Sequence, residues 1–191
     1  MIRVLGLGNV LMSDDGFGPY VARVLEAFYE FPHDVEVIDM GTPGLDLTPY
    51  LLNTKAVIFM DTVTSSGAPG ETRVYDRAAI LRHAPQARTG PHDPALKEAL
   101  LTVDAAGAGP DTVTLIGVIP AWIATGVTLS PAVSAAVTTV ARMVIDELDR
   151  MGVRAIPRPV PRTPHIWWER ESPPAMRNSP QSGDGNPARV P

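Results

Sequence analysis

Apolar residues in the first third of the chain recur with two different spacings. Residues 2–8 form a nearly continuous apolar run that ends in glycine, which is typical of a strand buried on both faces of a parallel sheet. From Pro19 onward the apolar positions follow the i, i+3, i+4, i+7 spacing of one helix face: Val21, Val24, Leu25 and Phe28. Two further apolar runs, 35–39 and 56–61, indicate strands, with a short helix from about Leu45 to Leu52 between them. This alternation predicts a doubly wound α/β sheet.

The rest of the pattern extends this sheet. The linker 64–70 is rich in Ser, Gly and Pro and too short for a helical crossover, so the strand at 72–75 should run antiparallel. A helix from about Pro94 to Leu101 and a strand at 112–119 follow. Ser130 and Pro131 mark the start of a helix that continues to about Met151, because serine caps free N–H groups and proline has none to satisfy. We expect a three-layer α/β/α fold with a twisted, mostly parallel five-stranded sheet, one antiparallel strand and helices on both faces.

Length and composition indicate one domain followed by an extension. With 191 residues, of which 45% are hydrophobic, the chain can build one sizeable core but not two. Prolines become frequent beyond Ile156, and the segment 172–191 has few side chains able to form a core. We expect a folded domain at 1–153 and a Pro-rich, largely disordered extension at 154–191.

Charge and cysteine content remove several classes of function. A formal net charge of −5 gives no basic footprint for DNA or RNA, so nucleic acid is not expected as a partner. The chain has no cysteine, which excludes disulfides, thiolate metal sites and cysteine nucleophiles. The N-terminus lacks the basic start of a signal peptide, and no apolar run approaches the roughly 20 residues of a membrane span. These features predict a soluble, cytoplasmic protein without a membrane partner.

The loop after the first strand has the most informative sequence, Gly-Leu-Gly-Asn-Val-Leu-Met-Ser-Asp-Asp-Gly-Phe-Gly at 6–18. A dinucleotide-binding turn requires a third glycine where Leu11 stands, so the nucleotide interpretation is weak. The loop does contain an acidic pair, Asp14 and Asp15, at the edge where open α/β folds bind ligands. The alternative for either aspartate is that it merely caps the following helix.

Two further residues have the chemistry of a metal site. Asp61 closes the apolar strand 56–61, where a buried carboxylate needs a cation, a donor or water; its alternative is a cap or turn aspartate. His92 lies in a turn-rich loop, and its alternative is solvated surface. Two carboxylates and an imidazole that converge from separate loops suit a borderline divalent metal. The remaining histidines, His33, His83 and His165, are expected to be ordinary loop or tail residues.

Five motifs follow one another along the chain. They are the first loop, Asp-Met-Gly-Thr-Pro-Gly at 39–44, the strand ending in Asp61, Gly-Pro-His at 90–92, and Thr-Leu-Ile-Gly-Val-Ile-Pro at 114–120. In this order they resemble the nickel-iron hydrogenase maturation protease family over about residues 1–153. The resemblance implies a twisted sheet flanked by helices and an endopeptidase that removes a C-terminal extension from the hydrogenase large-subunit precursor after nickel insertion. It also implies that Asp15, Asp61 and His92 contact the metal.

The residue content constrains the mechanism. Without a cysteine or a Gly-x-Ser-x-Gly elbow, a covalent acyl-enzyme is disfavoured and water is the expected nucleophile. We hypothesise that Asp15, Asp61 and His92 bind nickel carried by the substrate, which serves as a recognition mark or also as a Lewis acid. No tightly held metal of the protein's own is expected. Asp39 is a candidate general base or positioning group, as in an aspartic-type enzyme, or else a turn aspartate bonded to its glycine loop.

The expected partner is the large-subunit precursor, and the expected oligomeric state is a monomer. Two alternatives stay open. One is a nickel-sensing chaperone of the large subunit without proteolytic activity. A protein that binds nickel through the same ligands but does not cut would show the same sequence motifs. The other is a nucleotide-binding regulator, which rests on Gly6 and Gly8 alone.

Overall fold

Five strands form the central sheet of the computed structural model, which describes residues 1–43, 47–82 and 95–171. In sheet order they are β3 (Val35–Gly41), β1 (Ile2–Leu7), β4 (Ala56–Thr62), β6 (Thr112–Val118) and β5 (Thr72–Asp76). The first four are mutually parallel, and β5 pairs antiparallel with β6. The short linker before β5 accounts for its direction, because a parallel return needs a longer crossover. The predicted mostly parallel, five-stranded sheet is confirmed.

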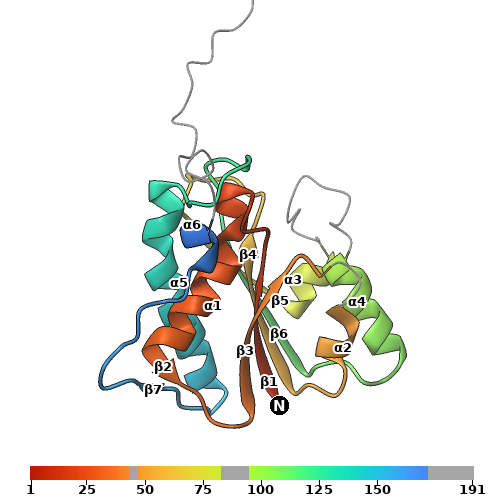
Figure 1. Cartoon of the computed structure of the whole chain (residues 1–191). Coiled ribbons are helices and arrows are strands. Elements are labelled where there is room, and N and C mark those ends of the chain that lie inside the picture. Colours follow the sequence, from red (N-terminus) through yellow and green to blue (C-terminus); the bar gives the residue numbers. More distant parts are fainter. Residues whose placement is uncertain (44–46, 83–94, 172–191) are drawn as a thin grey trace, which may run out of the picture.

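Helices cover both faces of this sheet (Figure 1). On one face lie α1 (Phe17–Phe28) and α5 (Pro131–Arg150). On the other lie α2 (Thr48–Leu51), α3 (Arg77–Arg82) and α4 (Ala95–Ala105). The three-layer arrangement is therefore as predicted, although the sequence pattern did not predict α3. None of the helices that the structure describes is both long and apolar enough to cross a membrane.

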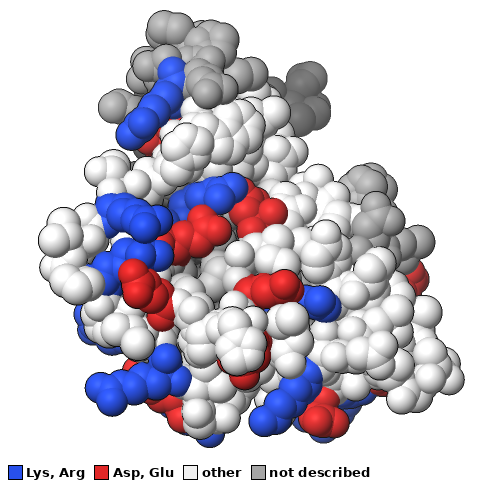
Figure 2. All heavy atoms as spheres, turned by 60° about the horizontal axis from the view of Figure 1, so that its bottom comes forward, with Lys and Arg blue, Asp and Glu red and all other residues white. Residues whose placement is uncertain are grey.

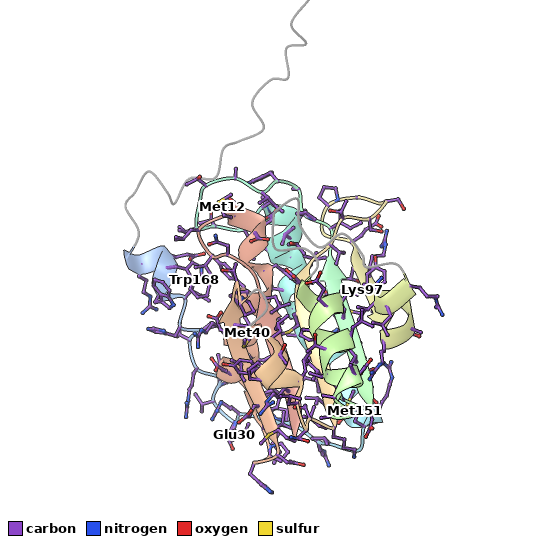
Figure 3. The ribbon with its side chains drawn as sticks, turned by 90° about the vertical axis from the view of Figure 1, so that its right-hand side faces the viewer. Met12, Glu30, Met40, Lys97, Met151 and Trp168 are labelled. Carbon is purple, nitrogen blue, oxygen red and sulfur yellow. The ribbon has the colours of Figure 1, made fainter. Side chains whose placement is uncertain are left out.

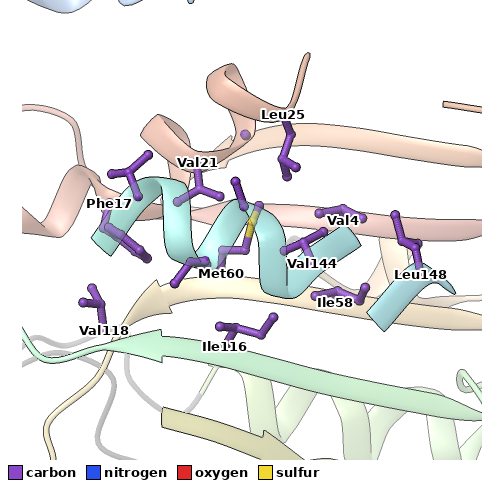
Figure 4. Packing of buried hydrophobic residues seen from close by; sticks show 14 of the residues in the cluster. Val4, Phe17, Val21, Leu25, Ile58, Met60, Ile116, Val118, Val144 and Leu148 are labelled. Carbon is purple, nitrogen blue, oxygen red and sulfur yellow. The ribbon is translucent and has the colours of Figure 1, made fainter. Parts of the chain in front are cut away.

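The larger core lies between the sheet and the pair α1 and α5 (Figure 4). Val21 and Leu25 of α1 are fully buried, as the helical spacing predicted, and they face Val4, Ile58 and Met60 of the sheet. Each fully buried side chain of this size contributes roughly 1.5–3 kcal/mol through removal from water. α5 starts as predicted, because the Ser130 hydroxyl accepts a hydrogen bond from the Val133 N–H at 3.4 Å.

Residues 154–171, the described part of the extension, pack against the domain. β7 (Ile156–Pro157) pairs antiparallel with β2 (Tyr29–Glu30), and α6 (Trp167–Glu171) follows. Trp168 is fully buried, with its ring edge-on to the Tyr20 ring of α1 at a centroid distance of 5.1 Å. The sequence pattern does not predict these contacts, because strands of two residues carry no periodicity. Residues 172–191 lie outside the described residues, and the domain boundary at 153 stays a prediction.

Acidic and basic side chains are interspersed over the amino end of the sheet, which Figure 2 brings forward. Arg3 pairs there with Glu36 at 2.9 Å, and Arg158 pairs with Glu30 at 2.6 Å. Exposed pairs of this kind contribute little to stability. The charged amino end lies opposite the edge at which the candidate site residues gather.

Candidate functional site

Asp15 and Asp61 lie at the same edge of the sheet. β1 and β4 are adjacent and parallel, with Gly6 opposite Met60, so their carboxyl ends meet at one edge. Asp61 is the next residue in β4, and Asp15 lies in the loop that leaves β1, within a short 3-10 helix at Ser13–Gly16. Open α/β sheets bind ligands at this edge.

The Asp15 carboxylate is buried and held on both oxygens. Asp15 is only 5% exposed. Oδ2 accepts a hydrogen bond from the backbone N–H of Asn9 at 2.9 Å, and Oδ1 accepts one from the Thr62 hydroxyl at 3.4 Å. These two bonds orient the Asp15 carboxylate at the edge of the sheet.

Thr62 connects the two carboxylates. Its hydroxyl donates to Asp15, and its backbone N–H donates to Oδ1 of Asp61 at 2.8 Å. Asp61 is itself 4% exposed and Thr62 is 1% exposed. The sequence pattern did not predict a role for Thr62. The only signal was a polar Asp-Thr pair that ends an otherwise apolar strand.

Close approach of the first loop to the strand ends explains two of its glycines. A Cβ atom at Gly18 would lie 2.3 Å from the carbonyl oxygens of Leu7 and Met60. Gly8 has a φ of +142°, and a Cβ atom there would lie 1.8 Å from the Asp15 carbonyl oxygen. Only glycine permits both contacts. The glycines therefore let α1 begin directly against the ends of β1 and β4, which places Asp15 at the site.

Asp14 points away from Asp15 and has a structural function. It is fully buried and accepts three backbone hydrogen bonds, from Ala121 at 2.8 Å, Trp122 at 3.1 Å and Ser130 at 2.6 Å. Neither aspartate caps α1, whose N-cap residue Gly16 has no side-chain bond. The helix-cap alternative for the acidic pair is therefore wrong. Asp14 instead fastens the loop after β6 to the first loop.

Asp39 lies on the other face of the sheet from Asp61. Strand alternation places Asp39 on the face of α1, where its carboxylate pairs with Arg23 at 3.0 Å. Its second oxygen accepts from the Gly41 N–H at 3.2 Å, which is the contact expected of a turn aspartate. Asp61 shares its face with Phe59, in the core beneath α2 and α4. The structure thus does not bring Asp39 against Asp61.

His92 lies outside the described residues. The helices on either side of its segment, α3 and α4, both cover the face that Asp61 shares. His33 and His165 are exposed, as expected of loop and tail residues. Within residues 1–43, 47–82 and 95–171, no group of three or more His, Asp or Glu side chains is close enough to hold a metal ion.

Comparison with known proteins relates this arrangement to hydrogenase maturation. A family model described as hydrogenase maturation protease matches residues 19–147. The chain is 34% identical over 161 residues to the hydrogenase 2 maturation protease of Escherichia coli (strain K12), covering 82% of this chain and 96% of that protein. It is 30% identical over 159 residues to the hydrogenase expression/formation protein HoxM of Cupriavidus necator, covering 83% of this chain and 79% of that protein.

Solved structures give the same result. The hydrogenase maturating endopeptidase HybD from E. coli matches with a TM-score of 0.77 at 33% identity, covering 82% of this chain and 97% of that chain. The hydrogenase 2 maturation peptidase from a Thaumarchaeota archaeon matches with a TM-score of 0.58 at 34% identity, covering 77% and 97%. Since the family model spans more than half of the chain and the fold matches that of solved relatives, the chain belongs to the hydrogenase maturation protease family.

Proposed function

We propose that this protein is an endopeptidase that removes the C-terminal extension from the nickel-loaded precursor of a [NiFe] hydrogenase large subunit in the cytoplasm. The observation that carries this proposal is the pair Asp15 and Asp61. Both are nearly buried carboxylates at the carboxyl ends of adjacent parallel strands, and Thr62 bonds to both. Two buried carboxylates at the edge where open α/β sheets bind ligands suit a divalent cation.

The cation in this proposal is the nickel that the precursor already holds. Asp15, Asp61 and His92 contact it, while the precursor's own ligands complete its coordination. Carboxylate oxygen and imidazole nitrogen are suitable ligands for a divalent ion of this kind. The enzyme then needs no tightly held metal of its own, and a precursor without nickel is not cut.

Water is the nucleophile in this mechanism, because the chain has no cysteine to form an acyl-enzyme. Nickel marks the loaded precursor, and as a Lewis acid it also polarises the scissile carbonyl. The contacts of Asp39 with Arg23 and the Gly41 N–H favour a positioning role for this aspartate, as part of the support for α1 and the first loop. General-base work then belongs to Asp15 or Asp61, in an aspartic-type reaction.

Incubation with purified precursor tests the function directly. Nickel-loaded precursor should lose a C-terminal peptide, measured by mass spectrometry, whereas nickel-free precursor should stay intact. Asp61→Asn and His92→Ala should each lower the rate at least about a hundredfold, as expected when a group that acts only in the reaction is removed. The midpoint of thermal unfolding should change little, because Asn keeps the acceptor for the Thr62 N–H.

Asp111→Asn is the matched control. Asp111 is an exposed aspartate at the opposite, amino end of β6, so this change should leave the rate unaltered. A wild-type protein that binds nickel-loaded precursor and never cuts it would contradict the proposal and favour a nickel-sensing chaperone. Large losses of stability in Asp61→Asn would instead indicate a purely structural carboxylate.

A further inference from the structure

Two loops beside Asp15 form an uncharged, largely apolar surface, which we call the apolar rim and define as residues 9–13 and 121–127. Their sequences are Asn-Val-Leu-Met-Ser and Ala-Trp-Ile-Ala-Thr-Gly-Val, in a chain of which 19% is charged. Leu11 is 44% exposed and Ile123 is 38% exposed. Single exposed apolar side chains are ordinary on protein surfaces. Here one such side chain lies on each of two coupled loops that carry no charge, which distinguishes this edge from the charged amino end (Figure 2).

The two loops are bonded into one unit. Met12 and Gly126 form a parallel β-bridge. The Gly126 N–H donates to the Leu11 carbonyl at 3.0 Å, and the Ser13 N–H donates to the Gly126 carbonyl at 2.8 Å. The Ser13 hydroxyl adds a bond to the Ala124 carbonyl at 2.9 Å. The segments around Leu11 and Ile123 therefore lie side by side, at the end of the molecule where Figure 3 labels Met12.

Buried hydrogen bonds hold the backbone of the rim in place, including one residue in a strained conformation. Asp14 lies within the first loop and holds the N–H groups of Ala121 and Trp122 from the second. Ser13 has a φ of +50°, in the left-handed region that residues other than glycine rarely adopt. Strained conformations of this kind persist only where the surrounding structure determines them, and they cluster at functional sites. An apolar surface that is already rigid loses little entropy when a partner binds.

We propose that the apolar rim is the docking surface for the large-subunit precursor, with Leu11 and Ile123 contacting apolar side chains next to the scissile bond. This inference rests on the proposed function. A peptide bond that is cut at Asp15 and Asp61 lies next to the rim, because the backbone N–H of Asn9 in the rim donates to the Asp15 carboxylate. The absence of charge on the rim favours apolar segments of the partner over an acidic or basic one.

The test is steady-state processing of nickel-loaded precursor by the full chain. The double variant Leu11→Ser/Ile123→Ser should raise KM about tenfold or more, since truncation of buried interface anchors has effects of this size, with kcat within about threefold of wild type. Val74→Ser and Leu101→Ser remove side chains that are 58% and 48% exposed elsewhere on the surface, and both should keep the wild-type KM. Thermal unfolding of all variants should match wild type.

A crosslinking measurement keeps the inference testable should the double variant fold poorly. A photoreactive residue at position 123 should couple to purified precursor, and one at position 74 should not. A wild-type KM in a folded double variant, or a fall in kcat alone, would overturn the docking surface. A wild-type dimer that the double variant dissociates would also overturn it, in favour of a second copy of the chain. If the wild-type protein cuts no precursor but a photoreactive residue at position 123 still couples to it, the proposed function is wrong and the docking surface is not.

Discussion

Thr62 lies between the two carboxylates of the candidate site and bonds to each through a different group. Its backbone N–H holds Asp61, so this bond survives any substitution except proline. Its hydroxyl holds Asp15, so this bond depends on the side chain. The side chain at position 62 therefore controls the orientation of one carboxylate without disturbing the other.

Thr62→Val tests this positioning role. Valine keeps the shape but removes the donor to Asp15, and the loss of a buried hydrogen bond of about 1 kcal/mol should lower kcat for processing roughly fivefold. Thr62→Ser restores the hydroxyl and should recover most of the rate. Equal activity of Thr62→Val and wild type would show that Asp15 needs no support from this residue. Equal loss in both variants would show that the hydroxyl alone does not recover the rate, which would contradict this positioning role.

The sequence could predict which edge carries the site but not how it is held. Asp15 and Asp61 follow recognisable strands, and parallel neighbours end at the same edge, so their placement there follows from local pattern and topology. The contacts of Thr62 and Asp14 depend on tertiary structure: Asp14 bonds to residues more than a hundred positions away. For Asp39 the local pattern was misleading. Its position at the end of a predicted strand suggested a site residue, but the alternation of side chains along β3 directs it toward Arg23.

Both β7 and α6 join the extension to the domain, and α6 does so through a buried aromatic side chain. Its Trp168 is completely buried against Tyr20 of α1, whereas the neighbouring Trp167 is 39% exposed. The Tyr20 hydroxyl contacts Glu169 of α6 and donates to the Val127 carbonyl at 2.7 Å. α6 thus supports α1 and the second loop of the apolar rim together.

Trp168→Ala should lower the free energy of unfolding by about 3–5 kcal/mol, the usual cost of emptying a buried aromatic site. Trp167→Ala is the matched control and should cost well under half of that, because its ring is partly in solvent already. Chemical denaturation followed by circular dichroism measures both. Similar losses in the two variants would mean that the described packing of α6 does not contribute in solution.

The longer elements were predictable, and so were the short α2 and β5, whereas β2, β7, α3 and α6 were not. The strands β1, β3, β4 and β6 and the helices α1 and α5 carry enough residues for their apolar spacing to identify them. The pair β2 and β7 has two residues in each strand, and α6 has five. The strands β2 and β7 and the helix α6 form because of their tertiary contacts, so no local sequence pattern predicts them.

At the scale of the whole molecule, the burial of Tyr20 makes the folded protein less stable at alkaline pH. Burial raises the pKa of the Tyr20 hydroxyl above its ordinary value of 10.0, and the hydrogen bond with Glu169 raises it further. The folded protein therefore keeps this proton at a pH where the unfolded chain loses it. The folded state binds more protons, so the free energy of unfolding falls as the pH rises above about 10.

Denaturant titrations at pH 8 to 11 measure this slope. Wild type should lose stability progressively above pH 10, and Tyr20→Phe should show a shallower decline over the same range, although it starts less stable because it lacks the hydroxyl. Parallel slopes for the two proteins would show that Tyr20 is not the group responsible.

The contact between Tyr20 and Glu169 joins positions that are 149 residues apart in the sequence. Contacts of such high contact order require closure of a long loop, so we expect this one to form late, after the sheet has assembled. A nascent chain still attached to the ribosome would expose the aromatic ring of Tyr20 until α6 emerged. Emergence of α6, rather than assembly of the sheet, would then decide when the loop at Val127 acquires the support of Tyr20 and Glu169 together.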